Sequence, residues 1–360
     1  MDLIHLALQS IPILKSAIAV AAVFVVCVVI HEYGHYSVAK HYGVSVPAFA
    51  IGMGPKIFKW MRRGTEFSIR AFPIGGFVQL AGEVPQDTLF RIGEQIAYEL
   101  GPTGKLKVIA DPRDLPHANV ATLRGLDLYN RLEMTLETSE GIHTYSVQPY
   151  AKLMTGVRSS MPIVSKDEQM IGKPLYQRAL MILAGPFMNF LLAGVLFSAT
   201  FMHIGVPIQT PYIGQVVSGS AAAEAGLLAG DKVVQINGTV IRNWNDVVMG
   251  IQGDRTNPPA PLNIEIQRNG KIESIHVVPK VNKQGIPILG INEPVTYNPA
   301  KAVQAGFSSV YTQTIATAQM YGQVVSKHQF KDLAGPVGIA DVIGQQAQAG
   351  IWQVVMIAGF

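Results

Sequence analysis

An unbroken apolar run from Ser16 to Ile30 leads directly into the sequence His31-Glu32-Tyr33-Gly34-His35. A helix over residues 12–40 has roughly 29 residues and a length of about 43 Å, which is enough to cross a bilayer. Histidines four residues apart share one helix face and can ligate one zinc ion, while Glu32 can serve as general base to a metal-bound water. We therefore expect residues 1–40 to form a membrane-spanning helix with a candidate metal site.

The location of the HExxH pattern favours the metal interpretation. By chance alone the pattern is expected in roughly one to two per cent of chains of this length. Ionisable side chains at the end of an apolar helix are costly, and residues of this kind in a membrane span are usually functional. A signal peptide is the alternative, but no small-residue cleavage site follows Ile30, and cleavage would remove the motif.

Composition agrees with a membrane protein that also has water-exposed domains. Hydrophobic residues reach 49% and charged residues only 14%, whereas soluble domains are usually about a quarter charged. The length of 360 residues allows two or three domains. The single cysteine, Cys27, lies inside the first apolar run, so an intrachain disulfide is excluded.

A second apolar segment, residues 179–203, is also long enough to span a bilayer. Pro186 should kink it, and Ala184 and Gly185 permit close packing of another helix. Asn189 differs from its neighbours, because an amide inside a span usually finds a partner across the helix bundle.

Basic residues flank both apolar segments. Residues 39–63 contain no acidic residue, and more cations precede the second segment. The positive-inside rule therefore places the connection 41–178 in the cytoplasm and the segment after residue 203 outside. Attraction to anionic lipid explains the net charge of +4 without nucleic acid. The flanking cations are Lys40, Lys56, Lys59, Arg62, Arg63, Lys166, Lys173 and Arg178.

Residues 67–83 alternate apolar and polar side chains around a glycine pair, which predicts a β-hairpin. Its edge can pair with an extended peptide by strand addition, although a purely structural hairpin fits the pattern equally well. The candidate substrate-binding residues are Gly75, Gly76, Phe77, Val78 and Gln79. Residues 84–170 continue as short alternating pieces, which predict a small β-rich insertion without evident chemistry.

Residues 210–285 have the pattern of a compact domain. We expect a strand at 212–217, short helices at 221–225 and 245–252, and a hairpin of 262–268 and 272–279 that turns at Asn269-Gly270. This order and the sequence of residues 226–238 resemble a PDZ domain, a module that binds peptide termini by strand addition. Residues 211–214 occupy the place of its carboxylate-binding loop, and the ligand is unknown.

Together these segments resemble the site-2 protease family of intramembrane zinc metalloproteases, peptidase family M50, in its bacterial regulator-of-sigma-E type. The single PDZ domain and the insertion are more like the Gram-positive members. The resemblance implies an α-helical polytopic membrane core with a cytoplasmic β-hairpin and β-rich insertion and an extracytoplasmic PDZ domain, a mixed α+β fold. It rests on residues 31–35, 75–83, 184–190, 210–285 and 326–339, the last containing Leu333-Ala334-Gly335-Pro336-Val337-Gly338-Ile339.

The resemblance also implies a site and a function. His31 and His35 are then zinc ligands, Glu32 activates the water, and residues 75–79 with Asn189 bind the substrate. The expected activity is cleavage of single-span membrane proteins, such as anti-sigma factors and signal-peptide remnants, in regulated intramembrane proteolysis. The expected location is the bacterial cell membrane, with several spans, the active site near the cytoplasmic face and the PDZ domain outside.

One feature departs from the family pattern. The family takes its third zinc ligand from an aspartate in a Leu-Asp-Gly motif of a later span, and this sequence contains no such motif. We expect residues 333–360 to begin an incomplete third span, because the apolar stretch 350–360 has 11 residues where about 20 are needed. Asp341 is the nearest carboxylate but does not match the family position. Residues 300–332 predict an interfacial helix, with a plain surface helix as the alternative.

Two other classes of function are compatible with parts of the pattern. A non-proteolytic membrane adaptor would bind protein tails through the PDZ domain and would keep the HExxH motif as a relic, so that Glu32→Gln would change nothing. A transporter or channel would need more spans and paired intramembrane charges than the sequence has.

Overall fold

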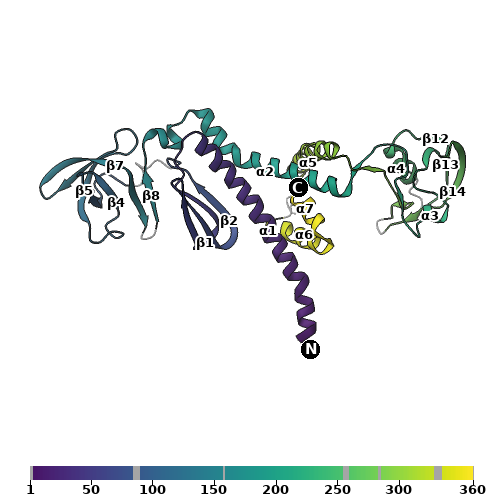
Figure 1. Cartoon of the computed structure of the whole chain (residues 1–360), viewed down its shortest axis with the longest axis horizontal. Coiled ribbons are helices and arrows are strands. Elements are labelled where there is room, and N and C mark those ends of the chain that lie inside the picture. The colour runs from purple at the N-terminus through teal and green to yellow at the C-terminus, as the bar shows by residue number, and fades with distance from the viewer. Residues whose placement is uncertain are drawn as a thin grey trace. The chain divides into compact units, whose positions relative to one another are not determined.

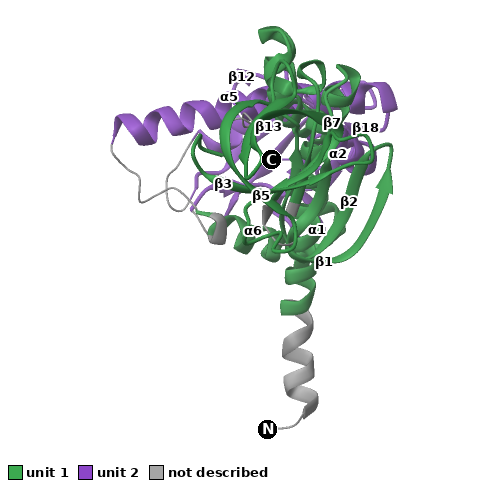
Figure 2. Cartoon of the chain, turned by 90° about the vertical axis from the view of Figure 1, so that its left-hand side faces the viewer, with its two compact units in different colours: residues 1–192, 329–358 green, residues 193–328, 359–360 purple. Residues whose placement is uncertain are grey.

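The computed structural model of the protein describes residues 3–83, 90–156, 159–253, 259–282, 285–327 and 335–359. The chain divides into two compact units, which Figure 2 shows in green and purple. The first comprises residues 1–192 and 329–358, and the second comprises residues 193–328 and 359–360. Helices and strands are mixed, as the sequence predicts.

Helices α1 (Leu3–His41) and α2 (Leu175–Ile204) are the two in the described part of the chain that are long and apolar enough to cross a membrane. In α1 the qualifying segment is Ile13–His41, close to the predicted 12–40. The helix ends where Gly43 adopts a φ of +70° and the Val44 N–H donates to the Ala39 carbonyl at 2.9 Å. A glycine is favoured there because this φ is strained for other residues.

The N-terminal part of α2 packs directly on α1. A Cβ added at Gly34 would meet the backbone of Ala184, which is itself buried, so the two helix backbones approach as closely as a glycine permits. Helix α2 is continuous through Pro186. Small residues at these positions therefore bring α2 against the turn of α1 that carries the histidines.

Two further helices, α6 (Pro336–Ala349) and α7 (Ile351–Ala358), lie beside α1 in the first unit (Figure 1). The Ser16 hydroxyl donates to the Gly344 carbonyl at 2.9 Å. Gly350, with a φ of +139°, separates α6 from α7 within the segment predicted to begin a span. Residues 333–334 of the predicted 333–339 motif lie outside the described residues.

The prediction for residues 67–83 placed the turn of the hairpin at the wrong residues. Strands β1 (Ala48–Arg62) and β2 (Thr65–Gln79) form the hairpin, and they turn at Arg63-Gly64 rather than at Gly75-Gly76. Residues 48–51 pair on one side with residues 66–69 and on the other with residues 76–79. The glycine pair instead lies where β2 returns across the start of β1, a non-local pairing that alternation alone does not encode.

The insertion is a small barrel. Strand β4 pairs with β7 as well as β3, which closes the order β4-β3-β5-β6-β7, and β8 extends it. Its apolar core includes Ile96, Leu123 and Leu153. The strands are β3 (Gln95–Leu100), β4 (Leu106–Ala110), β5 (Asn119–Asp127), β6 (Glu133–Thr138), β7 (Gly141–Gly156) and β8 (Ser159–Ile163), and two 3-10 helices follow at Lys166–Glu168 and Met170–Gly172.

The second unit contains the PDZ-like domain. Its main sheet has the order β12-β11-β13-β14, with α3 and α4 packed on it. The domain extends past the predicted residue 285, because β17 pairs with β10. Its elements are β9 (Val206–Pro207), β10 (Gln215–Val216), α3 (Ala221–Glu224), β11 (Lys232–Ile236), β12 (Thr239–Val240), α4 (Trp244–Gln252), β13 (Leu262–Arg268), β14 (Lys271–Val277), β15 (Lys280–Val281), β16 (Pro287–Ile288), β17 (Ile291–Asn292) and β18 (Val295–Thr296).

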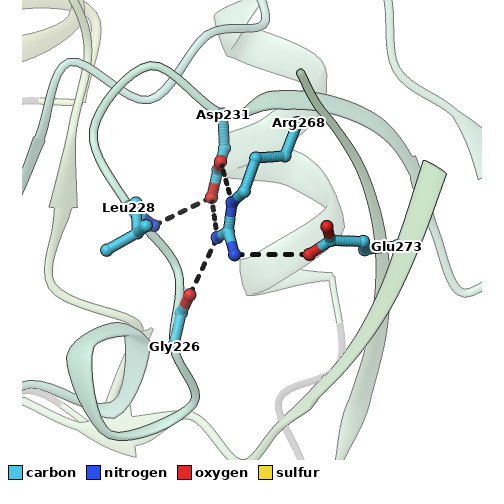
Figure 3. Close-up of polar contacts among 5 residues, drawn as sticks. All are labelled: Gly226, Leu228, Asp231, Arg268 and Glu273. Atoms are coloured by element: carbon cyan, nitrogen blue, oxygen red, sulfur yellow. Dashed lines mark hydrogen bonds and ion pairs between the residues drawn. The ribbon is translucent and has the colours of Figure 1, made fainter. Parts of the chain in front are cut away.

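A buried ion pair ties the loop before β11 to β13. Asp231 is 2% exposed and accepts hydrogen bonds from Arg268 Nε and Nη2 at 2.8 and 2.7 Å (Figure 3). The Leu228 N–H donates to the same carboxylate at 2.8 Å. Because these donors satisfy the buried carboxylate, the loop is fixed in place. The predicted turn at Asn269-Gly270 is also present, with φ of +51° and +78°.

Helix α5 (Pro299–Ser326) packs on the C-terminal part of α2 within the second unit. A Cβ at Gly306 would meet Ser198, and a Cβ at Gly194 would meet the Phe307 ring. The N-terminus of α5 is capped by Asn298, whose side chain accepts from the Ala300 N–H at 2.9 Å. Residues 328–332 of the predicted interfacial helix lie outside the described residues.

Candidate metal centre and active site

The two histidines of the motif lie on one face of α1, as their spacing predicts. Their ring centroids are 4.9 Å apart, with the ring planes 74° from parallel. Both rings point toward α2, where Met181, Gly185 and Asn189 contact them. The structure therefore brings His31 and His35 together with Asn189, all three of them predicted site residues.

The hydrogen bond of His35 fixes its protonation pattern. Its Nδ1 lies 2.7 Å from the Met181 carbonyl oxygen, which can only accept a hydrogen bond. Nδ1 therefore carries a proton, which leaves Nε2 as the ring nitrogen that can bind a metal. Metal-ligating histidines commonly donate their second ring nitrogen to a carbonyl or carboxylate in this way.

His31 has its own partner on α2. Its Nδ1 lies 3.3 Å from the side-chain nitrogen of Asn189. The Oδ1 atom of Asn189 is buried and has no hydrogen-bond partner among the described residues. An orphaned buried oxygen is costly, so its position beside a candidate ligand calls for an explanation.

The free ring nitrogens face one small space. A Cβ added at Gly185 would meet Nε2 of His31 at 2.6 Å and Nε2 of His35 closer still. Both Nε2 atoms therefore border a volume that the absence of a side chain at residue 185 keeps open. Two imidazole nitrogens beside one space match the nitrogen ligands that zinc prefers, so the residues present fit the metal.

A complete ligand set is not found among the described residues, where no group of three or more His, Cys, Asp or Glu side chains gathers. Asp341 is exposed and accepts from Gln345 Nε2 at 2.9 Å. Its helix contacts Ser16, fifteen residues before His31 and therefore about 22 Å away along the axis of α1. Asp341 is thus remote from the histidines, in agreement with its mismatch to the family position.

The glycine-rich strand lies beside Glu32. A Cβ at Gly76 would meet Val28 Cγ1 at 2.8 Å and Glu32 Cγ at 3.6 Å. Residues 76–79 pair only with residues 48–51 in the described part of the chain, so they form an edge of the sheet. The predicted segment 75–79 and the predicted base are therefore neighbours, which neither pattern alone could establish.

A groove of about 1330 Å³ runs along this hairpin. Phe77 and Gln79 of the edge strand line it, and Arg70 lies over the Phe77 ring at 4.9 Å. Cations dominate its charged lining, with Lys40, Lys56, Lys59, Arg63, Arg70 and Lys152 against Glu66 and Glu168. The two acids are engaged, Glu66 with Lys56 and Glu168 with the Tyr150 hydroxyl.

A second groove, of about 940 Å³, lies in the PDZ-like domain between α4 and the strands β16 and β17. Of the predicted carboxylate-binding loop 211–214, only Gly214 lines it. Residues 287–290, at the junction of β16 with β17, also line it. Glu293 also lines the groove, and burial raises the pKa of its carboxyl group.

Sequence reasoning did not identify Met181 and Gly185 as parts of the site. The smallness of Gly185 suggested helix packing alone, and a backbone carbonyl carries no side-chain signal. The available signal was spacing, since residues 181, 185 and 189 follow one another at intervals of four and share one face of α2.

Known proteins match nearly the whole chain. The model of peptidase family M50 matches residues 19–360. The zinc metalloprotease RasP of Geobacillus kaustophilus is 34% identical over 95% of this chain and 82% of that protein. The regulator of sigma-W protease RasP of Bacillus subtilis is 32% identical over 96% of this chain and 83% of that protein. A probable protease of Enterococcus faecalis, eep, is 33% identical over 96% and 83%.

Solved structures are similar over one part of the chain. The PDZ domain of the SdrC-like protein from Listeria monocytogenes is 22% identical over 25% of this chain and 93% of that chain, with a TM-score of 0.22.

Proposed function

This chain belongs to peptidase family M50 and is a zinc metalloprotease of the membrane, and on that basis we propose that it cuts single-span membrane proteins inside the bilayer. The observation that carries the proposal is the position of the convergent histidines and Glu32 on a helix long enough to span, beside an unpaired strand edge. Anti-sigma factors and signal-peptide remnants are the proposed substrates. The Bacillus subtilis relative is named as a regulator of sigma-W protease.

The edge strand solves a problem specific to membrane substrates. The backbone amides of a spanning helix are already bonded within the helix, and an exposed amide in lipid is costly. A protease must therefore unwind the helix before it can reach a peptide bond. Residues 76–79 offer replacement hydrogen bonds to an extended segment and hold it next to Glu32.

The chemistry is divided between the metal and the chain. Zinc, when bound, acts as a Lewis acid and would lower the pKa of a water molecule to about 7, so that hydroxide is available as the nucleophile at neutral pH. His31 and His35 hold the metal, and Glu32 accepts the proton of the attacking water and returns it to the leaving amine. Proton transfer by a positioned carboxylate contributes about 10²- to 10⁴-fold to such reactions.

We further propose a multi-pass protein of the bacterial cell membrane, with the active site near the cytoplasmic face and the PDZ domain outside. The cation-rich lining of the hairpin groove supports this orientation, because the cytoplasmic flanks of membrane spans are enriched in Lys and Arg.

The groove between α4 and β17 supports peptide binding by the PDZ domain. We propose extended protein segments as its ligands. Such binding is also what a non-proteolytic adaptor would need. The protease function requires Glu32. The adaptor function does not, because peptide binding at the groove does not use this residue.

The test is cleavage of a labelled single-span substrate in detergent by the chain and by its Glu32→Gln variant, with the cut position mapped by mass spectrometry. We expect products cut within the span from the parent and none from the variant. Equal cleavage by parent and variant, or no cleavage by either, would contradict the proposal and favour the adaptor.

A further inference from the structure

We infer that one face of α2, made of Met181, Gly185 and Asn189, positions both zinc ligands and keeps the metal's volume empty. The inference deepens the proposed function, on which it rests. The three residues succeed one another at intervals of four, so they form a line on the helix. Each contacts a ring nitrogen of His31 or His35, or the space between the two rings.

Met181 sets the tautomer of His35 through its backbone. Because the carbonyl oxygen only accepts, the 2.7 Å contact requires the proton on Nδ1 and leaves the Nε2 lone pair for the metal. A backbone contact of this kind does not depend on the side chain at residue 181. It depends on the close approach of α1 and α2 at Gly34 and Ala184.

Asn189 acts on His31 through its side chain, and the orientation of its amide decides which ring nitrogen carries the proton. With its nitrogen toward Nδ1, the amide makes Nδ1 an acceptor, puts the proton on Nε2 and leaves Oδ1 buried without a partner among the described residues. Rotation of the amide by 180° exchanges the donor and acceptor in this contact and moves the ring proton from Nε2 to Nδ1. Oδ1 then accepts from the Nδ1 proton, the orphaned oxygen is satisfied, and Nε2 gains the lone pair that zinc needs.

This role differs from the substrate contact expected of Asn189 from the sequence. The amide faces the side of the His31 ring opposite to Nε2, so it acts on the ligand rather than on the substrate. Asn189 is therefore a positioning residue in this account. Outer-shell partners of this kind typically change metal affinity by about 10- to 100-fold when they are removed.

Gly185 contributes by having no side chain. A methyl group there would lie at or below 2.6 Å from both Nε2 atoms, well inside contact distance. The rings cannot swing aside without breaking the bonds of Nδ1 to Met181 and Asn189. Alanine is also favoured over glycine in a helix interior. Metal loss in Gly185→Ala would therefore not reflect a weakened α2.

The experiment measures zinc affinity of the full chain in detergent by competition with a chromophoric chelator, together with zinc content by elemental analysis. The variants are Gly185→Ala, Asn189→Leu and Asn189→Asp. The control is Gly322→Ala, a helical glycine with no atom within 4 Å of the added methyl. Helix content and thermal unfolding are recorded for every variant to verify folding.

We expect zinc affinity to fall at least 100-fold in Gly185→Ala and about 10- to 100-fold in Asn189→Leu. Asn189→Asp should stay within about threefold of the parent, because its carboxylate oxygen still accepts from Nδ1. The absorption bands of bound cobalt should change in Asn189→Leu and be restored in Asn189→Asp. Control and parent should agree.

Parent-like affinity in Gly185→Ala, or equal affinities in Asn189→Leu and Asn189→Asp, would overturn the inference, as would a parent that binds no zinc. If Gly185→Ala fails to fold, the two Asn189 variants decide the outcome alone. Normal zinc binding by the parent without substrate cleavage would instead count against the proposed function and leave the positioning role intact.

Discussion

Two polar clusters in this protein are built in opposite ways. In the PDZ-like domain, Asp231 and Arg268 direct their hydrogen bonds at each other and at neighbouring groups of the same domain (Figure 3). In the membrane helices, His31 and His35 each use one ring nitrogen on α2 and direct the other into a shared space. In the first arrangement the hydrogen bonds stay within the domain and fix a loop. In the second, one ring nitrogen of each histidine faces the shared space and can bind a metal.

The difference teaches how to separate a structural polar cluster from a functional one. Contact between two secondary-structure elements is common to both clusters. What distinguishes the histidines is that both Nε2 atoms border one space, next to the proposed general base Glu32 and an unpaired strand edge.

The largest effect should come from a ligand. His35→Ala removes one of two convergent nitrogens and should weaken zinc binding by more than about 1000-fold, beyond the 10- to 100-fold typical of outer-shell partners. The stability of the PDZ domain should not change. Zinc affinity and substrate cleavage are the measurements. Retention of zinc by this variant would break the comparison, because it would mean that the histidines are a structural pair.

The reciprocal change is Asp231→Ala, which leaves a largely buried guanidinium without its carboxylate. Breaking a buried ion pair costs about 3–5 kcal/mol. Because the Arg268 side chain is 23% exposed and can be hydrated, we expect about 2–3 kcal/mol. Urea unfolding followed by the fluorescence of buried Trp244, in a background with the other two tryptophans replaced by Phe, measures it. Zinc affinity should stay at the parent value, and a parallel loss of zinc would show that the clusters are coupled.

A smaller effect is expected at the strand edge. The methyl group of Gly76→Ala would press on Val28 and on the Ala50 carbonyl at 2.8 Å, so residues 76–79 must shift away from Glu32. Cleavage should fall about 10- to 30-fold, since misplacement of about 1 Å can cost up to about 100-fold. Zinc affinity should be unchanged, with Gly322→Ala as the matched control. Cleavage at the parent rate would remove the edge strand from the account.

The smallest effect concerns Glu293 in the PDZ groove. Burial raises the pKa of its carboxyl group above 4.5, its ordinary value, so the folded domain favours the protonated form. Stability is therefore lost as pH rises through the folded pKa. Glu293→Gln should stabilise the domain at pH 7 by less than about 0.5 kcal/mol and have no effect at pH 3. The Trp244 unfolding curves at the two pH values test this, and a variant less stable at pH 7 would contradict it.

Local patterns predicted much of this molecule. The apolar runs gave α1 and α2 within a few residues, and Asn269-Gly270 gave the β13–β14 turn because both residues tolerate positive φ. His31, Glu32 and His35 were identified by spacing on one helix. These features depend on interactions between residues a few positions apart, which the sequence displays directly.

Features that depend on distant segments were missed or misplaced. The glycine pair at 75–76 was predicted as a turn, but it lies where β2 crosses the start of β1. The barrel closes through a β4–β7 pairing between residues 106–109 and 147–153, for which alternation gives no partner. Gly185 suggested packing alone, because its role appears only when the histidines of another helix are placed beside it.

The central claim is that the free ring nitrogens of His31 and His35 converge to hold zinc. X-ray absorption at the zinc edge of the purified, zinc-loaded chain tests it most directly, because the scattering counts imidazole ligands. The account predicts one zinc per chain with two imidazoles at about 2.0–2.1 Å, and no bound zinc in His35→Ala. Zinc without imidazole scattering, or a His35→Ala chain with the parent's zinc spectrum, would contradict it.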